Sequence, residues 1–573
     1  MKLLRDIFFL IALALVFFQG DVLAQGLPKL DLHSLWVDQT FNHLSKKEKI
    51  AQLFMVAAYS NKGQEFTDSV GKIIRKNQPG GIIFFQGGPI RQSILLNQYQ
   101  ESLKVPALVA LDAEWGLGMR LDSTQSFPYQ MSLGAIQGDR WILEMGREIG
   151  RQLKRIGVQV NFAPVLDINN NYKNSVINFR SFGDRREMVS AKGIAYIQGL
   201  QEMNILATGK HFPGHGDTEV DSHKDMPILP FSRSRLDSLE LFPFKMAVNS
   251  GIGGMMIAHM NVLAFDTNAH LPSSLSENII QGALKKDLGF QGLIFTDAMN
   301  MKGVLKYYPT GTAELMALKA GNDMVEMSLD LKKSIKMVKR SIRKGEITWE
   351  SIENRTRKIL AWKEYLGLSR FNPVKLENLP QDLHTPKSDS LIQRLSDLSI
   401  TLLRDRNFKD NYLTDKESSG IILSINPGPI SILDSELASY YQLPKIQIPR
   451  DLDSIKVQEL RKKLKDYDYV LILAHDSRPR PGSSLHYSKA LNQFLNEESS
   501  QFNRFLVLLG NPYAFLEFPK VKDAYNLLVT YQDSPYTERS TLKFLKGNLR
   551  TQGKLPVEIP GLFYHGEGIR YRR

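Results

Sequence analysis

Between residues 50 and 330, short apolar segments alternate with longer amphipathic ones, and this repeat constrains the fold more than any other feature. Short, nearly continuous apolar runs are typical of parallel strands that are covered on both faces. The segments 186–203, 232–250 and 276–288 have helical patterns. Eight βα units in succession predict an α/β fold of the (β/α)8 TIM-barrel type. The expected strands are 50–58, 81–85, 107–112, 158–167, 207–211, 254–259, 292–297 and 323–327.

A second α/β unit follows the barrel after helical segments and a polar stretch at 375–388. Its alternating strands and helices predict a C-terminal α/β sandwich domain of the doubly wound kind. We therefore expect a signal peptide (1–24), a barrel (25–370), a linker (371–395) and a C-terminal domain (396–573). The expected elements are strands 398–403, 420–425, 469–474, 505–509 and 525–530, with helices 454–464 and 488–496.

The first 24 residues have the pattern of a targeting segment. Lys2 and Arg5 precede an apolar run, and Val22-Leu23-Ala24 fits a cleavage site after Ala24. The run is short for a membrane span, although an uncleaved signal anchor is the alternative. The sequence therefore predicts an exported protein, periplasmic or secreted, with no stable membrane insertion after cleavage.

The composition excludes several kinds of chemistry. The chain has no cysteine, so disulfides, thiolate metal sites and a cysteine nucleophile are excluded. The net charge of +13 is spread over the sequence without a long basic block. This pattern favours a solvated surface over nucleic-acid binding, although an anionic cell-wall polymer would be attracted. We expect a monomer with a carbohydrate substrate and no nucleic-acid partner.

The loop at 209–224 contains three of the eleven histidines. His211 and His215 have a spacing that on a helix can bind zinc. Pro213 and Gly214 oppose a helix, and the glutamate of a His-Glu-x-x-His site is absent. We therefore expect neither a metal nor another cofactor.

Acid–base chemistry is the better interpretation of this loop. Asp221 lies two residues before His223, so the carboxylate can fix the tautomer of the imidazole while its other nitrogen moves a proton. Asp297 ends the apolar strand at 292–297 and is a candidate nucleophile. The alternatives are a surface pair for Asp221 and His223, and a salt bridge or helix cap for Asp297.

A further group of charged residues follows the expected strand ends. Such donors and acceptors at a barrel mouth suit the recognition of sugar hydroxyls, although each could instead form a structural ion pair. The group consists of Asp112, Arg120, Arg180, Lys210 and His211.

Together these motifs resemble bacterial β-N-acetylglucosaminidases (β-N-acetylhexosaminidases) of glycoside hydrolase family 3. The resemblance rests on Lys-His-Phe-Pro-Gly-His-Gly-Asp-Thr at 210–218 and Asp-Ser-His at 221–223, and on blocks at 161–171, 180–183 and 296–299. It spans about 44–366, and the second domain resembles the family more weakly, through 508–512 and 553–557.

The resemblance implies a role for each candidate. Asp297 is the expected nucleophile, and His223 is the expected acid/base, oriented by Asp221. The five charged residues named above are expected to hold N-acetylglucosamine in the −1 subsite, while His215 is expected to be structural. The family's usual Asp-Gln-Glu-Gly-Gly reads Asp112-Ala113-Glu114-Trp115-Gly116 here, so we expect Trp115 to reshape the mouth of the site, where the aglycone binds.

The expected reaction is a retaining, two-step hydrolysis that releases terminal, non-reducing N-acetylglucosamine, with peptidoglycan fragments or chito-oligosaccharides as substrates. Three alternatives stay open at this point. The chain could be a β-glucosidase-like family 3 glycosidase. It could be an N-acetylglucosaminide phosphorylase, because a site without a second anionic catalyst admits phosphate. It could also be a cell-wall glycan-binding protein without catalysis, although Asp297 and His223 are both present.

Overall fold

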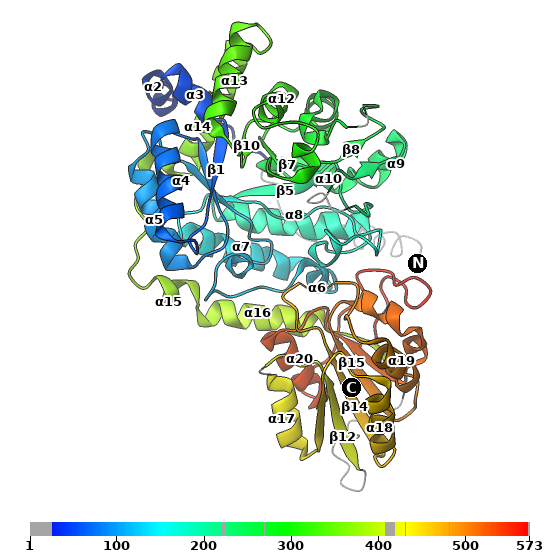
Figure 1. Cartoon of the computed structure of the whole chain (residues 1–573). Helices are drawn as coiled ribbons and strands as arrows, with labels where there is room; N and C mark the ends of the chain where they lie inside the picture. The colour runs from blue at the N-terminus through cyan, green and yellow to red at the C-terminus, as the bar shows by residue number, and fades with distance from the viewer. Residues whose placement is uncertain are drawn as a thin grey trace, which may run out of the picture.

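The computed structural model describes residues 26–220, 225–268, 270–406, 419–429, 431–480 and 482–570. The expected signal peptide and the Asp221–His223 pair lie outside these residues. The described chain forms a barrel domain and a separate sheet domain that lie one above the other (Figure 1). Within these ranges no helix combines the length and the apolar character that crossing a bilayer requires.

The N-terminal domain is a nearly closed barrel of eight parallel strands, as the sequence predicts. A backbone bridge between Phe295 and Met324 joins the two edges of the sheet. Apart from two half-buried residues in the first strand, every strand residue is buried, which explains the continuous apolar runs. Around the barrel the strands are β10 (Val325–Glu326), β1 (Phe54–Ala58), β2 (Gly81–Phe84), β3 (Leu108–Leu111), β4 (Val160–Asn161), β5 (Leu206–Phe212), β7 (Gly254–Ile257) and β9 (Leu293–Thr296).

Helices cover the outside of the barrel, and the structure corrects the expected elements at 232–250 and at residues 50–51. The segment expected as one helix at 232–250 is split in two, because Pro243 begins a new first turn. Residues 50 and 51 belong to a helix that Ser45 caps, so the first strand begins later than expected. The main helices are α2 (Leu35–His43), α3 (Lys46–Ala51), α4 (Gln64–Asn77), α5 (Pro89–Glu101), α6 (Gln130–Gly134), α7 (Arg140–Arg155), α8 (Arg186–Glu202), α9 (Arg233–Ser238), α10 (Phe242–Asn249), the π-helix η4 (Asn278–Asp287), α12 (Thr312–Ala320), α13 (Leu331–Arg343) and α14 (Trp349–Tyr365).

The second domain contains a six-stranded sheet in which all pairs are parallel except that of its first edge strand. The five predicted strands are present, and β13 is an additional edge strand. In sheet order the strands are β11 (Thr401–Asp405), β16 (Asn526–Val529), β15 (Arg504–Leu509), β14 (Tyr469–His475), β12 (Gly420–Ile425) and β13 (Lys445–Ile448), with helices α17 (Ile432–Tyr441), α18 (Ser454–Leu464), α19 (Lys489–Glu498) and α20 (Pro535–Leu545).

Two helices occupy much of the segment between the domains, where we expected a polar linker. They are α15 (Leu379–Leu383) and α16 (Pro386–Ser399), and α16 packs against α6, α7 and α20. Thr385 accepts a hydrogen bond from the Ser388 amide, and Pro386 stands in the first turn, so this polar sequence is a helix start. The helix runs along the boundary of the two domains (Figure 1).

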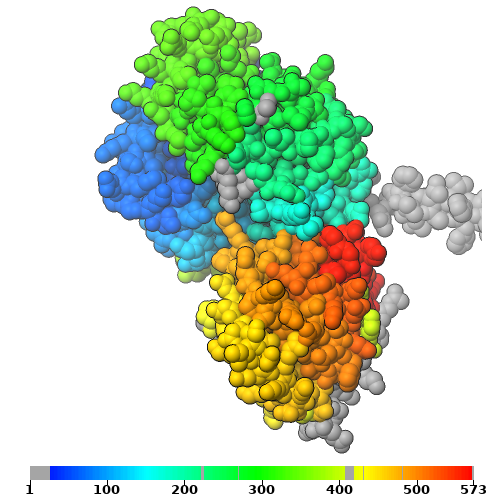
Figure 2. Space-filling view, turned by 45° about the vertical axis from the view of Figure 1, so that its right-hand side comes forward, coloured from blue at the N-terminus to red at the C-terminus, as the bar shows by residue number. Residues whose placement is uncertain are grey.

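The two domains share an apolar cluster. Trp115, Met131 and Phe179 of the barrel domain are buried in the same cluster as Leu485 and Phe515 of the second domain. The space-filling view shows the two lobes packed directly against each other (Figure 2). The second domain is therefore held close to the barrel strand ends that carry the expected site.

Candidate active site

A cavity of about 940 Å³ lies at the carboxyl ends of the barrel strands. This is the end at which barrels of this type carry their chemistry. Asp112 follows β3, Lys210 and His211 lie in β5, and Asp297 follows β9, and all four line the cavity. The second domain also contributes to its wall, through Arg480, Gly482, Ser483, Ser484, His486 and Leu516.

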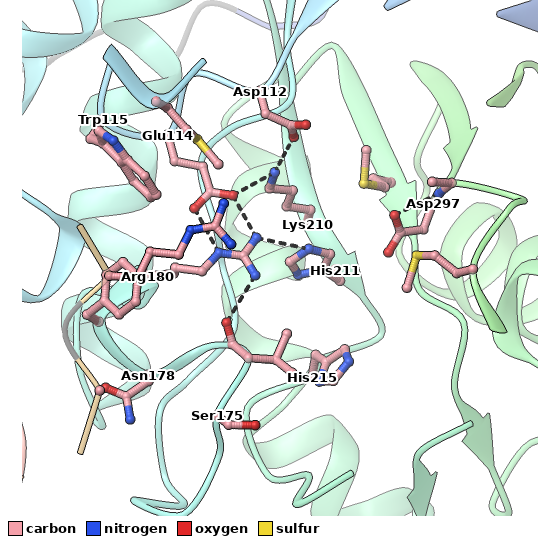
Figure 3. Close-up of a pocket in the computed structure, with 18 of the residues that line it drawn as sticks. Asp112, Glu114, Trp115, Ser175, Asn178, Arg180, Lys210, His211, His215 and Asp297 are labelled. Atoms are coloured by element: carbon pink, nitrogen blue, oxygen red, sulfur yellow. Dashed lines mark hydrogen bonds and ion pairs between the residues drawn. The ribbon is translucent and has the colours of Figure 1, made fainter. Parts of the chain in front are cut away.

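The five expected sugar-binding residues come together in one charged network, and Figure 3 shows Asp112, Arg180, Lys210 and His211 of it. The Nζ atom of Lys210 lies 2.7 Å from Oδ1 of Asp112 and 2.8 Å from Oε1 of Glu114. The Nη2 atom of Arg120 lies 2.6 Å from Oδ2 of Asp112. Asp112 therefore holds two cations, one from the barrel strand β5 and one from the loop that follows β3.

Glu114 is the centre of the other half of the network, and the sequence analysis did not assign it to the site. Its carboxylate is completely buried and accepts two hydrogen bonds from Arg180, from Nε at 2.9 Å and from Nη2 at 2.6 Å. The same Arg180 Nη2 atom lies 3.5 Å from Nε2 of His211. The Asp-x-Glu spacing of Asp112 and Glu114 was the signal that could have identified this carboxylate.

The network fixes the charge of its members. Burial alone would raise the pKa of Asp112, but Lys210 and Arg120 outweigh burial and hold it well below its ordinary value. In the same way, Arg180 and Lys210 outweigh burial and hold the pKa of Glu114 at about 2. The carboxylates in turn outweigh the effect of burial on Lys210 and Arg180 and raise the pKa of both. All four groups are thus ionised at neutral pH.

Asp167 orients the two histidines of the loop that the structure describes. Its carboxylate lies 2.7 Å from Nδ1 of His211 and accepts a hydrogen bond of 2.7 Å from the backbone amide of His215. Burial alone would raise the pKa of Asp167, but the nearby histidines outweigh burial and lower it. With Nδ1 held by Asp167, the Nε2 atom of His211 is turned toward Arg180 in the cavity wall.

His215 is buried with its Nδ1 atom 2.8 Å from the Thr218 hydroxyl. Burial and the neighbouring His211 lower its pKa to about 4, so the ring is neutral at neutral pH. Among the residues that the structure describes, His211 and His215 do not belong to a group of side chains that could share a cation. Within the described part of the chain, such a group is formed by His475, Asp533 and Glu538 in the second domain.

Asp297 faces the charged network from the opposite side of the cavity (Figure 3). Its backbone amide donates to the Ile257 carbonyl at 3.0 Å, which fixes the end of β9 against β7. Its Oδ1 atom accepts a hydrogen bond of 2.8 Å from the Ala298 amide. The candidate nucleophile is therefore anchored at a strand end. Asp221 and His223 lie outside the described residues, so their position relative to Asp297 stays a prediction.

Trp115 lines the cavity but is nearly buried. Its ring packs edge-on against Tyr129 at 4.8 Å and is tilted against Phe179 at 6.0 Å. Both partners belong to the barrel domain, and the group continues into the apolar cluster that the two domains share. The tryptophan thus forms a wall between the charged network and the second domain.

The sequence matches the model of the glycosyl hydrolase family 3 N-terminal domain over residues 45–362. A β-N-acetylglucosaminidase/β-glucosidase of Cellulomonas fimi is 23% identical over 91% of this chain and 95% of its own length. A β-hexosaminidase of Nitrosomonas eutropha is 34% identical over 43% of this chain and 72% of its own length.

Among solved structures, a family 3 β-N-acetylglucosaminidase from Paenibacillus sp. strain FPU-7 superposes with a TM-score of 0.77 at 28% identity. The superposition covers 90% of this chain and 99% of the other. The matched sequence region is the domain whose barrel carries the cavity, and the solved structure extends the similarity to both domains. The chain belongs to glycoside hydrolase family 3.

Proposed function

We propose that this chain is a retaining β-N-acetylglucosaminidase, which removes terminal, non-reducing β-linked N-acetylglucosamine from glycans. The observation that carries the proposal is the position of Asp297 across one cavity from a buried, fully ion-paired network. Relatives named for this activity support it, both in sequence and in structure.

In this proposal the network binds the terminal sugar. Asp112 offers carboxylate acceptors, while Lys210 and Arg180 offer charged donors, and both kinds of group suit a sugar's hydroxyls. Because the ion pairs hold these side chains before a ligand arrives, binding costs little side-chain entropy. Arg120 and His211 complete the set around the same sugar.

The proposed reaction has two steps. Asp297 attacks the anomeric carbon, the glycosidic bond breaks, and His223 gives its proton to the departing oxygen. In the second step His223 takes a proton from water, the water oxygen bonds to the anomeric carbon, and Asp297 leaves as a carboxylate. Asp221 accepts a hydrogen bond from His223 and fixes its tautomer. A histidine in the acid role adds no negative charge beside Asp297.

The proposed substrates are peptidoglycan fragments or chito-oligosaccharides met outside the cytoplasm. The export signal expected at residues 1–24 supports this setting. The outer part of the cavity, lined by second-domain residues such as Arg480 and His486, is the proposed place for the rest of the glycan.

The test is hydrolysis of nitrophenyl glycosides by the wild type and by Asp297→Asn. We expect the wild type to cleave the N-acetyl-β-glucosaminide in preference to the β-glucoside. We expect Asp297→Asn to lose at least about 10³-fold in kcat, since the nucleophile is removed. Asp451→Asn, at an exposed aspartate of the second domain, is the matched control. Preference for the glucoside, or an Asp297→Asn variant as active as the control, would contradict the proposal.

A further inference from the structure

Glu326 is an acidic residue in the cavity to which the proposed mechanism gives no role. It is the last residue of β10, it lines the cavity, and its side chain is almost completely buried, with 2% exposure. Val325, its neighbour on the strand, does not line the cavity and packs instead in an apolar cluster. The alternation of the strand therefore turns Glu326 toward the substrate side.

The carboxyl group of Glu326 is incompletely satisfied. Within the described residues its Oε1 atom has no hydrogen-bond partner. The backbone on either side is well held, because the Glu326 amide donates to Thr296 Oγ1 at 3.0 Å and its carbonyl accepts from the Met299 amide at 3.0 Å. A buried polar atom without a partner destabilises the protein, and such atoms in a binding cavity are commonly satisfied by the ligand.

The charged groups around Glu326 decide its protonation state. The charges that act on it are those of Asp112, Asp297 and Lys210. Lys210 is already paired with Asp112 and Glu114, so it offsets little of the repulsion. Burial, together with the two neighbouring carboxylates, raises the pKa of Glu326 well above its ordinary value. A raised pKa favours the neutral carboxylic acid, which can donate a hydrogen bond where a carboxylate cannot.

We propose that Glu326 is a further sugar-binding residue, whose carboxylic acid donates a hydrogen bond to one hydroxyl group of the sugar held against Asp297. This assignment rests on the proposed function of the cavity. It gives the site an uncharged donor near the Asp297 nucleophile. A cation at this position would form an ion pair with the Asp297 carboxylate. An uncharged donor binds the hydroxyl without forming that pair.

The first test is a double comparison of enzyme and substrate. Wild type and Glu326→Leu are assayed on a nitrophenyl N-acetyl-β-glucosaminide and on its 3-, 4- and 6-deoxy analogues. Removing the contacted hydroxyl from the substrate should lower the kcat/KM of the wild type. The same removal should lower the kcat/KM of Glu326→Leu about tenfold less, because the variant has no contact to lose. Val325→Ala is the control for disturbing β10, and it should discriminate between the analogues as the wild type does. If Glu326→Leu discriminates between the parent substrate and each of the three deoxy analogues as strongly as the wild type does, the contact does not exist.

The second test uses Glu326→Gln, which keeps the shape of the side chain and does not depend on the leucine variant folding. Infrared difference spectra are recorded as N-acetylglucosamine binds. We expect a shifted C=O stretch of a protonated carboxyl group in the wild type that is absent in Glu326→Gln. The same band in both proteins, or no such band in the wild type, would overturn the proposal. If the wild type cleaves another glycoside instead, the proposed function fails, and both tests are run with that sugar.

Discussion

Arg180 and Glu114 form a two-bond ion pair whose carboxylate has no exposure to solvent. The pair joins the loop after β4 to the segment after β3, and Lys210 of β5 contacts the same carboxylate. Three neighbouring strands of the barrel are thus tied together at the end where the cavity opens. The position of both cations depends on a residue that does not itself need to touch the sugar.

We predict that Glu114→Gln damages both activity and stability. Removing one partner of a buried ion pair leaves the other charges unpaired, which costs about 3–5 kcal/mol of unfolding free energy. Because Lys210 and Arg180 would lose their common anchor, we expect kcat/KM to fall by about 10²-fold, as misplaced groups in a site commonly cause. Chemical denaturation and steady-state kinetics measure the two effects. Glu187→Gln, which breaks the exposed pair with Arg186, should change neither appreciably.

We predict that the effect of His223→Ala depends on the leaving group. Loss of a general acid lowers turnover by about 10²–10⁴-fold when the departing oxygen needs a proton. Aryl glycosides with acidic phenols leave without that help, so their first step should be affected much less. A series of substituted phenyl N-acetyl-β-glucosaminides measures this as a steeper dependence of kcat/KM on phenol pKa. An equal loss across the series would show that His223 is not the acid.

The barrel could be predicted from the sequence because nearly every strand residue is buried. That burial produces continuous apolar runs, and all eight strands were found, although the fourth covers only Val160–Asn161 of the predicted 158–167. The edge strand β13 was missed because its exposed positions carry Lys445 and Gln447, which break the apolar pattern. A buried strand has a recognisable apolar sequence, whereas the formation of an edge strand depends on the neighbouring strand with which it pairs.

Some residues of the site could be predicted from the sequence, and others were missed. Asp112, Lys210 and Asp297 stand at or beside strand ends, so the barrel hypothesis alone places them at one mouth. Glu114 lies beyond its strand, so only its spacing from Asp112 pointed to the site, and the fold shows that its carboxylate is buried in the network. Glu326 left a signal that went unused, since an acidic residue in the run Met324-Val325-Glu326-Met327 is unusual for a buried strand.

We predict that the second domain is stabilised by a charged, buried histidine. His475 is fully buried, with Nδ1 at 2.9 Å from Asp533 and Nε2 at 3.3 Å from Asp434. Burial alone would lower the pKa of His475, but the two aspartates outweigh it and raise the pKa from 6.5 to about 10. A raised pKa stabilises the fold fully below pH 6.5, and this contribution is lost as pH rises toward 10.

The measurement is the unfolding free energy of the wild type and His475→Gln between pH 6 and pH 10. The wild type should lose stability relative to the variant across this interval, because only the wild type has the imidazolium to lose. His384→Gln, at an exposed histidine, should follow the wild type. A difference between wild type and His475→Gln that stays constant with pH would mean that the ring is not charged in the folded protein.

The last prediction concerns the second domain's share of substrate binding. The loop that carries Arg480 is fixed to the barrel domain, because Ser483 Oγ donates to the Tyr172 carbonyl at 3.0 Å and accepts from Asn178 Nδ2 at 2.7 Å. The Tyr129 hydroxyl also donates to the Pro479 carbonyl at 2.5 Å. These contacts hold the exposed Arg480 side chain at the outer part of the cavity, beyond the network that we propose for the terminal sugar.

We therefore expect Arg480→Ala to raise KM for N,N′-diacetylchitobiose by about threefold to tenfold, the range for one lost hydrogen bond. The effect on a nitrophenyl N-acetyl-β-glucosaminide should be smaller, because its short aglycone extends less far from Asp297. Arg450→Ala, at an exposed arginine of the same domain outside the cavity lining, should leave both KM values unchanged. An equal rise for both substrates would place Arg480 at the terminal sugar. No rise for either would mean that the second domain closes the cavity without contacting the glycan.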